Sequence, residues 1–162
     1  MNPKRYKPLY LNLSGVEINS DFEKFGIGFR TIHGLYLNDY FSMAVGLGVD
    51  KIAEQTVFPI FGDLRIYFSR LKETIYFFGN YGYSFSEGVE PFFQKNAGSM
   101  LFSGFGFRTN RGGKYYASID LGYRFQYFRR ITFRYNNGTG MFSSDIFNDR
   151  FDAFVIRFAV SF

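Results

Sequence analysis

The sequence predicts an all-β chain whose eight antiparallel strands close into one up-and-down barrel, a single domain over residues 1–162. Apolar residues recur at every second position, glycines are scattered through the apolar segments, and helical spacing is rare. Together these observations indicate strands. We expect them at 8–18, 24–36, 39–50, 56–69, 73–85, 99–109, 114–135 and 150–162.

Each strand has one apolar face, clearest in the third, fourth, seventh and eighth strands and weakest in the first. In chain order this face comprises Leu9, Leu11, Leu13; Phe25, Ile27, Phe29; Phe41, Met43, Val45, Leu47, Val49; Phe58, Ile60, Leu64, Ile66, Phe68; Ile75, Phe77, Tyr81, Tyr83; Leu101, Phe105, Phe107; Tyr115, Ala117, Ile119, Leu121, Tyr123, Phe125, Tyr127; and Phe154, Ile156, Phe158, Val160, Phe162.

The opposite face carries glycine, alanine and serine (Ser14, Ser42, Ser84, Ser118 and Ser161) and most charges of the central strand regions. These charges are Arg30, Asp63, Arg65, Arg108, Asp120, Arg124 and Arg157. Glu17, Arg129 and Asp152 break the parity and are expected near strand ends. Because unpaired buried charges are costly, the seven form a predicted ion-pair network that closes the lumen; the alternative is a path for anions.

Volume decides which face points outward. The interior of an eight-stranded barrel is only wide enough for side chains to fill it, so it cannot hold all the large apolar residues. The small face also makes a poor solvent surface, since it has few lysine, glutamate, glutamine and threonine residues. We therefore expect the apolar face to contact lipid. The alternative is a soluble lipocalin-like barrel that binds a lipophile inside.

Connection lengths predict the orientation. The connections after the second, fourth and sixth strands are expected to be tight, whereas those after the third, fifth and seventh are expected to be longer, including 86–98 and 136–149. Outer-membrane barrels place short turns and both termini in the periplasm. The basic start, residues 1–8, is not followed by an apolar segment, so we expect a signal peptide to have been removed already.

The C-terminal strand carries the alternating apolar residues Phe154, Ile156, Phe158, Val160 and Phe162. In this the sequence resembles outer-membrane β-barrels, and over its whole length it is similar to the small OmpA/OmpX-type barrels. Its Phe/Tyr-rich, Trp-free composition resembles that of barrels from Bacteroidota. The resemblance implies a Gram-negative outer membrane and recognition of these five residues by the barrel-insertion machinery.

Composition argues against several site types. With no cysteine and one histidine, the chain has neither a thiolate nor a multi-histidine metal site, and we predict no cofactor. His33 falls on the lipid side near the short turns, whereas a lipid A enzyme needs its base at the opposite leaflet; no catalytic residue is predicted. The basic charge, net +5, is spread over tails, turns and lumen, so nucleic acid is not an expected partner.

The expected function therefore lies in the loops of a non-enzymatic barrel. Candidate contacts with lipopolysaccharide or with another outer-membrane protein are Arg129, Arg130, Arg134, Phe92 and Phe93. The chain is then an interaction protein or an accessory subunit of an outer-membrane assembly. The alternatives are a lipid A-modifying enzyme and a small-solute pore.

Overall fold

A computed structural model describes residues 9–21, 25–52, 55–69, 73–87, 96–110, 115–136 and 141–161. Eight strands are present in these ranges, and their bounds are β1 (Leu9–Ser20), β2 (Phe25–Tyr36), β3 (Phe41–Ile52), β4 (Gln55–Tyr67), β5 (Thr74–Glu87), β6 (Asn96–Asn110), β7 (Tyr116–Asn136) and β8 (Met141–Ser161).

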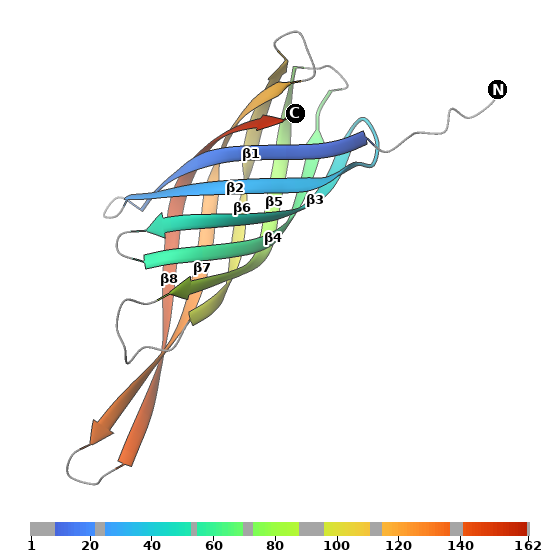
Figure 1. The fold of residues 1–162 in the computed structure, drawn as a ribbon. Helices are drawn as coiled ribbons and strands as arrows, with labels where there is room; N and C mark the ends of the chain where they lie inside the picture. Colours follow the sequence, from blue (N-terminus) through green and yellow to red (C-terminus); the bar gives the residue numbers. More distant parts are fainter. Residues whose placement is uncertain are drawn as a thin grey trace, which may run out of the picture.

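The strands form a closed antiparallel barrel. Each pairs with its neighbours in sequence, and β1 pairs with β8 from Ser14↔Val160 to Ser20↔Phe154 (Figure 1). The predicted eight-stranded up-and-down barrel is confirmed. No helix in the described part of the chain is long and apolar enough to cross a membrane.

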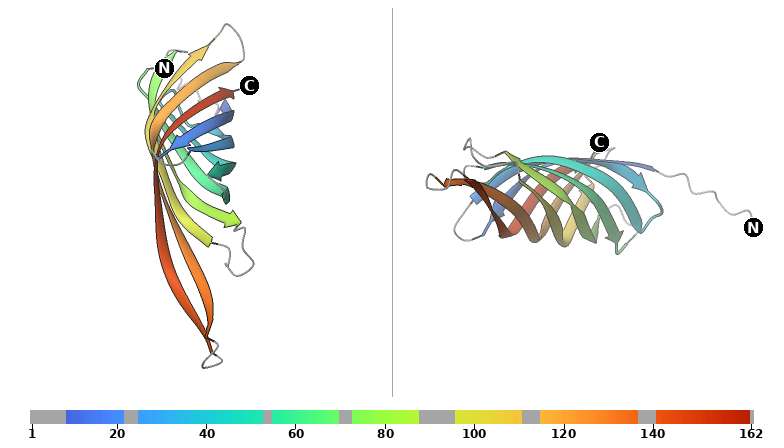
Figure 2. Two further views of the ribbon diagram at one scale, coloured as in Figure 1. Left: turned by 90° about the vertical axis from the view of Figure 1, so that its left-hand side faces the viewer. Right: turned by 90° about the horizontal axis from the view of Figure 1, so that it is seen from below.

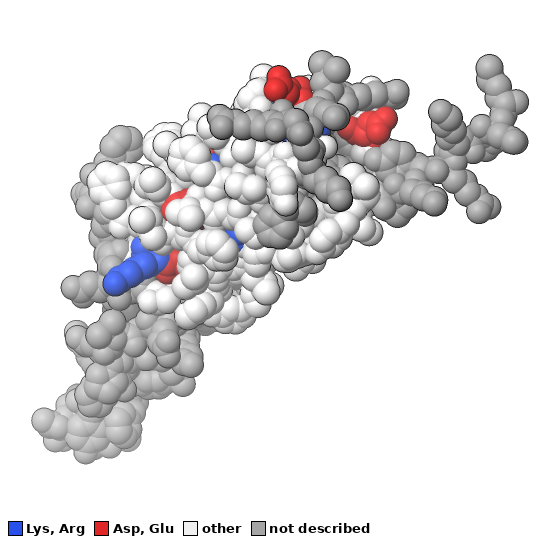
Figure 3. Space-filling view, turned by 45° about the horizontal axis from the view of Figure 1, so that its top comes forward, with Lys and Arg blue, Asp and Glu red and all other residues white. Residues whose placement is uncertain are grey.

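Burial alternates along every strand for which side chains are described, and from β2 to β8 it follows the predicted parity. Val45 and Ile27 are 61% and 62% exposed, while Arg30 and Arg124, on the other face, are fully buried. On the face of the barrel shown in Figure 3, most of the described surface is uncharged, and the larger charged groups lie toward its edges. The Phe/Leu/Ile face therefore covers the outside of the barrel, where acyl chains are the matching solvent.

The prediction for the first strand is wrong. Leu11 and Leu13 point into the barrel and are buried, and Glu17 is buried with them, whereas Ser14 lies on the outer face. Pairing with β2 imposes this parity, because Leu13 lies opposite the buried Ile32. The interior beside the first half of β1 is thus lined by leucines rather than by small residues.

Large side chains fill the interior in three clusters. One cluster contains Leu11, Leu13, Ile32, Phe61, Met100 and Ala159. A second contains Tyr67, Tyr76, Phe78, Phe102 and Val155, and a third contains Ile52, Val57, Phe151 and Ala153. The predicted face of glycine, serine and alanine therefore also holds aromatic and aliphatic side chains, which close the lumen together with the charges.

The predicted alternation of short and long connections is also wrong. Residues 88–95 separate β5 from β6, but only 53–54 separate β3 from β4, and only 137–140 separate β7 from β8. Most of the expected loop 136–149 is strand, because β8 begins at Met141 and pairs with β7 as far as Asn136. At this end β7 and β8 form a two-stranded ribbon that reaches well past the other strands (Figures 1 and 2).

Candidate functional site

The interior charges form the most elaborate polar structure of the barrel. Arg30, Asp63, Arg65, Asp120, Arg124 and Arg157 are all buried inside it, and Arg108 is partly buried. Two carboxylates that the sequence reasoning missed, Glu17 and Asp50, join them. Four buried arginines therefore meet four buried carboxylates, and the charges within the closed part of the interior balance.

One cluster, the quartet, consists of Glu17, Arg30, Asp50 and Arg124, from β1, β2, β3 and β7. Arg30 Nε lies 2.8 Å from Glu17 Oε2, and Arg30 Nη2 lies 2.7 Å from Asp50 Oδ2. Arg124 Nη1 donates to the same Asp50 oxygen at 2.9 Å, and its Nη2 pairs with Glu17. Each arginine thus bridges both carboxylates, tying strands from opposite parts of the sequence together.

Glycine makes room for this quartet. A Cβ at Gly28 would collide with the carboxylate of Asp50 and meet the side chain of Glu17. The guanidinium groups also lie over aromatic rings: the Arg30 Cζ is 5.1 Å from the Phe61 ring centre, and the Arg124 Cζ is 5.5 Å from that of Phe102. Stacking supplies part of the interaction that water would otherwise provide.

A second cluster links β4, β5, β7 and β8. Arg65 donates to both Asp63 oxygens, at 2.9 and 3.2 Å, and to the Tyr76 hydroxyl at 2.9 Å. Tyr76 in turn donates to Asp120, which accepts from Arg157 Nε at 2.9 Å. Asn80 closes the cluster by donating to Asp63 at 2.6 Å and accepting from Arg157 at 3.3 Å.

Arg108 lies apart from both clusters, near the end of the barrel where the termini are. Its Nη1 donates to the Tyr36 hydroxyl at 2.9 Å. Its Cζ lies 4.7 Å from the ring centre of Tyr67 and 5.1 Å from that of Tyr116. Among the described residues, the contacts of this fifth interior arginine are thus aromatic rings and a phenol hydroxyl.

The missed carboxylates have identifiable causes. Asp50 shares the inward parity of Ser42 and Gly46, but it is the last residue of the expected strand 39–50 and so falls outside the central strand regions from which the lumen charges are predicted. Glu17 was assigned outward because the parity of β1 was reversed. An imbalance of charge within the predicted lumen set, five arginines against two aspartates, was the available signal that carboxylates were missing.

The other predicted residues that the structure describes lie apart from the interior charges. Phe154, Ile156, Phe158 and Val160 are exposed in a row on the outer face of β8; Phe162 is outside the described residues, as are Phe92 and Phe93. Arg129, Arg130 and Arg134 lie on the part of β7 that extends beyond the barrel. The structure therefore brings the lumen residues together and places the three arginines of the loop prediction on the ribbon, apart from them.

His33 is outward, as predicted, and it is hydrogen-bonded at both ring nitrogens. Its Nδ1 lies 2.6 Å from the Tyr10 hydroxyl and its Nε2 lies 2.8 Å from Thr31 Oγ1. Among the described residues, no group of three histidine, cysteine, aspartate or glutamate side chains is arranged to hold a metal ion.

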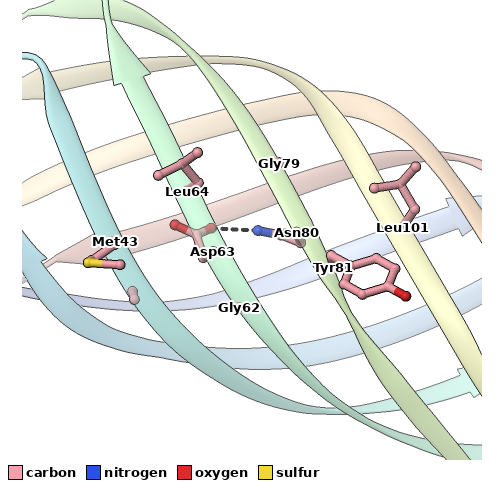
Figure 4. A pocket seen from close by; sticks show the side chains of 9 residues that line it. Met43, Gly62, Asp63, Leu64, Gly79, Asn80, Tyr81 and Leu101 are labelled. Carbon is pink, nitrogen blue, oxygen red and sulfur yellow. Dashed lines mark hydrogen bonds between the residues drawn. The ribbon is translucent and has the colours of Figure 1, made fainter.

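A hollow of about 470 Å³ interrupts the outer surface over β3 to β6 (Figure 4). Met43, Leu64, Tyr81 and Leu101 form its walls, while Gly62 and Gly79 provide no side chain to fill it. The Asp63–Asn80 hydrogen bond lies at the same level of the barrel. The hollow is therefore an apolar depression in the lipid-facing surface.

Gly79→Ala is expected to stabilise the barrel by about 0.5–1 kcal/mol, because glycine in a strand costs conformational entropy. A Cβ at Gly79 would meet no atom within 4 Å. Gly82→Ala, on the same strand, is the matched comparison: its Cβ would collide with the Ile60 carbonyl oxygen and the Phe61 backbone, so it is expected to destabilise. Urea unfolding in lipid vesicles measures both; equal effects would contradict the assigned geometry.

No protein-family model matches the sequence, and no curated protein matches it. Solved structures do match in fold. Neisserial surface protein A (NspA) aligns with a TM-score of 0.57 at 14% identity, over 96% of this chain and 98% of that chain. The outer membrane protein AlkL aligns with a TM-score of 0.52 at 9% identity, over 100% of this chain and 94% of that one. The outer membrane enzyme PagL aligns with a TM-score of 0.48 at 10% identity, over 93% and 98%.

These alignments cover nearly the full length of each compared structure. Because the sequence identities are low, they show a likeness of fold alone. The two likenesses with a TM-score above 0.5 agree with the closed antiparallel topology described above. The chain has the fold of the small eight-stranded outer-membrane β-barrels.

Proposed function

We propose that this chain is a non-enzymatic barrel of a Gram-negative outer membrane that binds a protein partner through its β7–β8 ribbon. The single observation that carries the proposal is the length of that ribbon. Pairing of β6 with β7 ends at Gln126, and pairing of β1 with β8 begins at Ser20↔Phe154. Beyond these points β7 and β8 pair only with each other among the described residues.

A two-stranded ribbon is marginally stable on its own in water, and its free edges are templates for another chain. Positions 127–136 of β7 continue past the barrel, which corresponds to about 30 Å of strand. A ribbon of this length gains stability when a partner covers one face or pairs with one edge. This supports a role in binding rather than in transport or catalysis.

The register gives the ribbon both apolar and charged positions. Ile131 pairs with Ile146 and Tyr135 pairs with Phe142. Charged residues lie between and beside these pairs, at Arg129↔Asn148, Arg130↔Phe147 and Thr132↔Asp145. The apolar positions suit a protein partner, and the charged positions suit water or the phosphates of lipopolysaccharide.

The ribbon lies at the opposite end of the barrel from the termini, since an even number of strands returns the chain to its starting side. We place the termini in the periplasm and the ribbon outside the cell, as in other outer-membrane barrels. The barrel-insertion machinery and membrane lipid are then expected partners of the apolar face of β8.

The alternatives have less support. A pore needs an open lumen, whereas the quartet, the second cluster and the apolar clusters occupy this one. A lipid A enzyme needs a base near the outer leaflet, and His33 lies toward the opposite end, where β2 meets the turn at 37–40. A soluble lipophile-binding barrel needs its large apolar face inside, and here that face is outside.

Replacing residues 128–149 with a short turn is expected to abolish partner binding while leaving the barrel folded, because all eight strands of the barrel remain. Partner binding is measured by cross-linking in native membranes followed by identification of the captured proteins. A matched variant with the residues between β5 and β6 shortened serves as the control. Capture of the same proteins by the ribbon-less variant would overturn the proposal.

A further inference from the structure

The outer face of β1 and β2 carries a polar tract, which we define as Tyr10, Asn12, Ser14, Thr31 and His33. All five have outward parity, and they occupy the half of the barrel nearer the termini. The same two strands continue toward the other end with exposed apolar side chains, among them Val16, Ile18, Ile27 and Phe29. The tract is thus a polar patch on an otherwise apolar part of the outer surface.

The tract is a connected chain of hydrogen bonds. Tyr10 Oη lies 2.6 Å from His33 Nδ1, His33 Nε2 lies 2.8 Å from Thr31 Oγ1, and Thr31 Oγ1 lies 3.4 Å from Ser14 Oγ. Asn12 lies opposite His33 in the ladder, and its Oδ1 is shielded from solvent without a hydrogen-bond partner in the described structure. At least one hydrogen-bond acceptor of the tract, Asn12 Oδ1, thus has no partner among the described residues.

Its surroundings are apolar on both sides. On β3, Val45 pairs with His33 and Leu47 pairs with Thr31, and both are more than half exposed. On β8, Val160 pairs with Ser14 and is 48% exposed. The tract thus lies within the belt that faces acyl chains, where unsatisfied hydrogen-bonding groups are costly and lipid tails offer them nothing.

We propose that the tract is the interface for a second copy of this chain, with β1 and β2 of the two barrels facing each other across a two-fold axis. The tract contains no carboxylate, lysine or arginine, and its hydroxyl, amide and imidazole groups both donate and accept. Such a set is complementary to itself, as an isologous interface requires. A charged partner would instead leave its charge unpaired within the lipid belt.

The two-fold arrangement brings the exposed Tyr10 and His33 of each copy against the tract of the other, so that their polar groups face polar groups rather than lipid tails. Hydrogen bonds of this kind hold transmembrane segments together where the hydrophobic effect cannot, because lipid is as apolar as the surface it covers. The aliphatic residues Val45, Leu47 and Val160 surround the polar contacts and exclude water from them.

Sedimentation equilibrium in detergent micelles and energy transfer between labelled copies in lipid vesicles measure the association. The wild-type chain is expected to dimerise. The variant carrying Asn12→Leu, Ser14→Ala, Thr31→Val and His33→Leu is expected to raise the dissociation constant at least roughly tenfold. Ser103→Val, an outward polar residue removed on β6, is the matched control and is expected to dimerise as the wild type does.

A second measurement does not depend on the folding of the tract variant. Because the sequence contains no cysteine, Val16→Cys introduces a single thiol beside the tract. Oxidation by copper phenanthroline is expected to link two copies through this thiol, with two electrons passing to the oxidant, and not through Leu121→Cys on β7. A wild-type chain that is monomeric in vesicles, or equal cross-linking at both positions, would overturn the proposal.

Discussion

Arg124→Met is expected to destabilise the barrel by about 3–5 kcal/mol, because it removes one cation from a balanced buried quartet. Arg124 pairs with Glu17 and Asp50, and all three side chains are fully buried. After the substitution Arg30 alone faces two carboxylates, so one negative charge remains uncompensated inside the lumen. The free energy of unfolding in urea, measured in lipid vesicles, reports the loss.

The double variant Arg124→Met, Asp50→Asn restores the balance of charge, leaving Arg30 with Glu17. It is expected to be more stable than Arg124→Met alone, although it lacks more ion pairs. Arg150→Met is the surface comparison: Arg150 pairs with Asp152 at 2.6 Å, but its side chain is 52% exposed, so the expected cost is below about 1 kcal/mol. A double variant that loses the sum of both single costs would contradict charge balance as the cause.

The two faces of the strands could be predicted from the sequence for β2 to β8 but not for β1. Period-two alternation predicted which face of β2 to β8 points outward, because each strand has a strongly apolar face. In β1 both faces contain leucine or isoleucine, so its parity was settled by pairing with β2, through contacts such as Leu13↔Ile32. Pairing between distant strands is not visible in a single strand's pattern.

The projecting ribbon was missed for a related reason. Residues 136–149 contain asparagine, glycine, serine and aspartate, which favour turns, and this composition predicted a long loop. In the structure only 137–140 separate the strands, since the ladder between β7 and β8 continues past the barrel. Turn-forming residues thus marked the position of the turn but overstated its length.

The polar tract had a partial sequence signal. His33 was expected outward, and its neighbours Thr31 and Asn12 are polar, but Ser14 was assigned to the lumen with the rest of β1 reversed. Only the register of β1 on β2 brings these side chains onto one surface. The interior network likewise required three-dimensional closure to bring together residues as distant as Glu17 and Arg124.

Ile60→Arg is expected to cost about 2–4 kcal/mol, because a charge on the lipid-facing side is most costly near the midplane of the bilayer. Ile60 lies near the middle of β4, points outward and is 48% exposed. In water the same substitution on an exposed strand position would cost little. The measurement is the free energy of unfolding in urea from vesicles with acyl chains of defined length.

Phe68→Arg provides the matched control, since Phe68 is 61% exposed directly after the end of β4. There an arginine reaches the polar headgroups, and the expected cost falls to at most about 1 kcal/mol. Ile60→Leu separates the effect of charge from that of shape and is expected to be nearly neutral. Thinner bilayers are expected to reduce the cost at Ile60, because the guanidinium then reaches water more easily. If Ile60→Arg and Phe68→Arg cost the same in every bilayer, the outer face of β4 does not span a membrane.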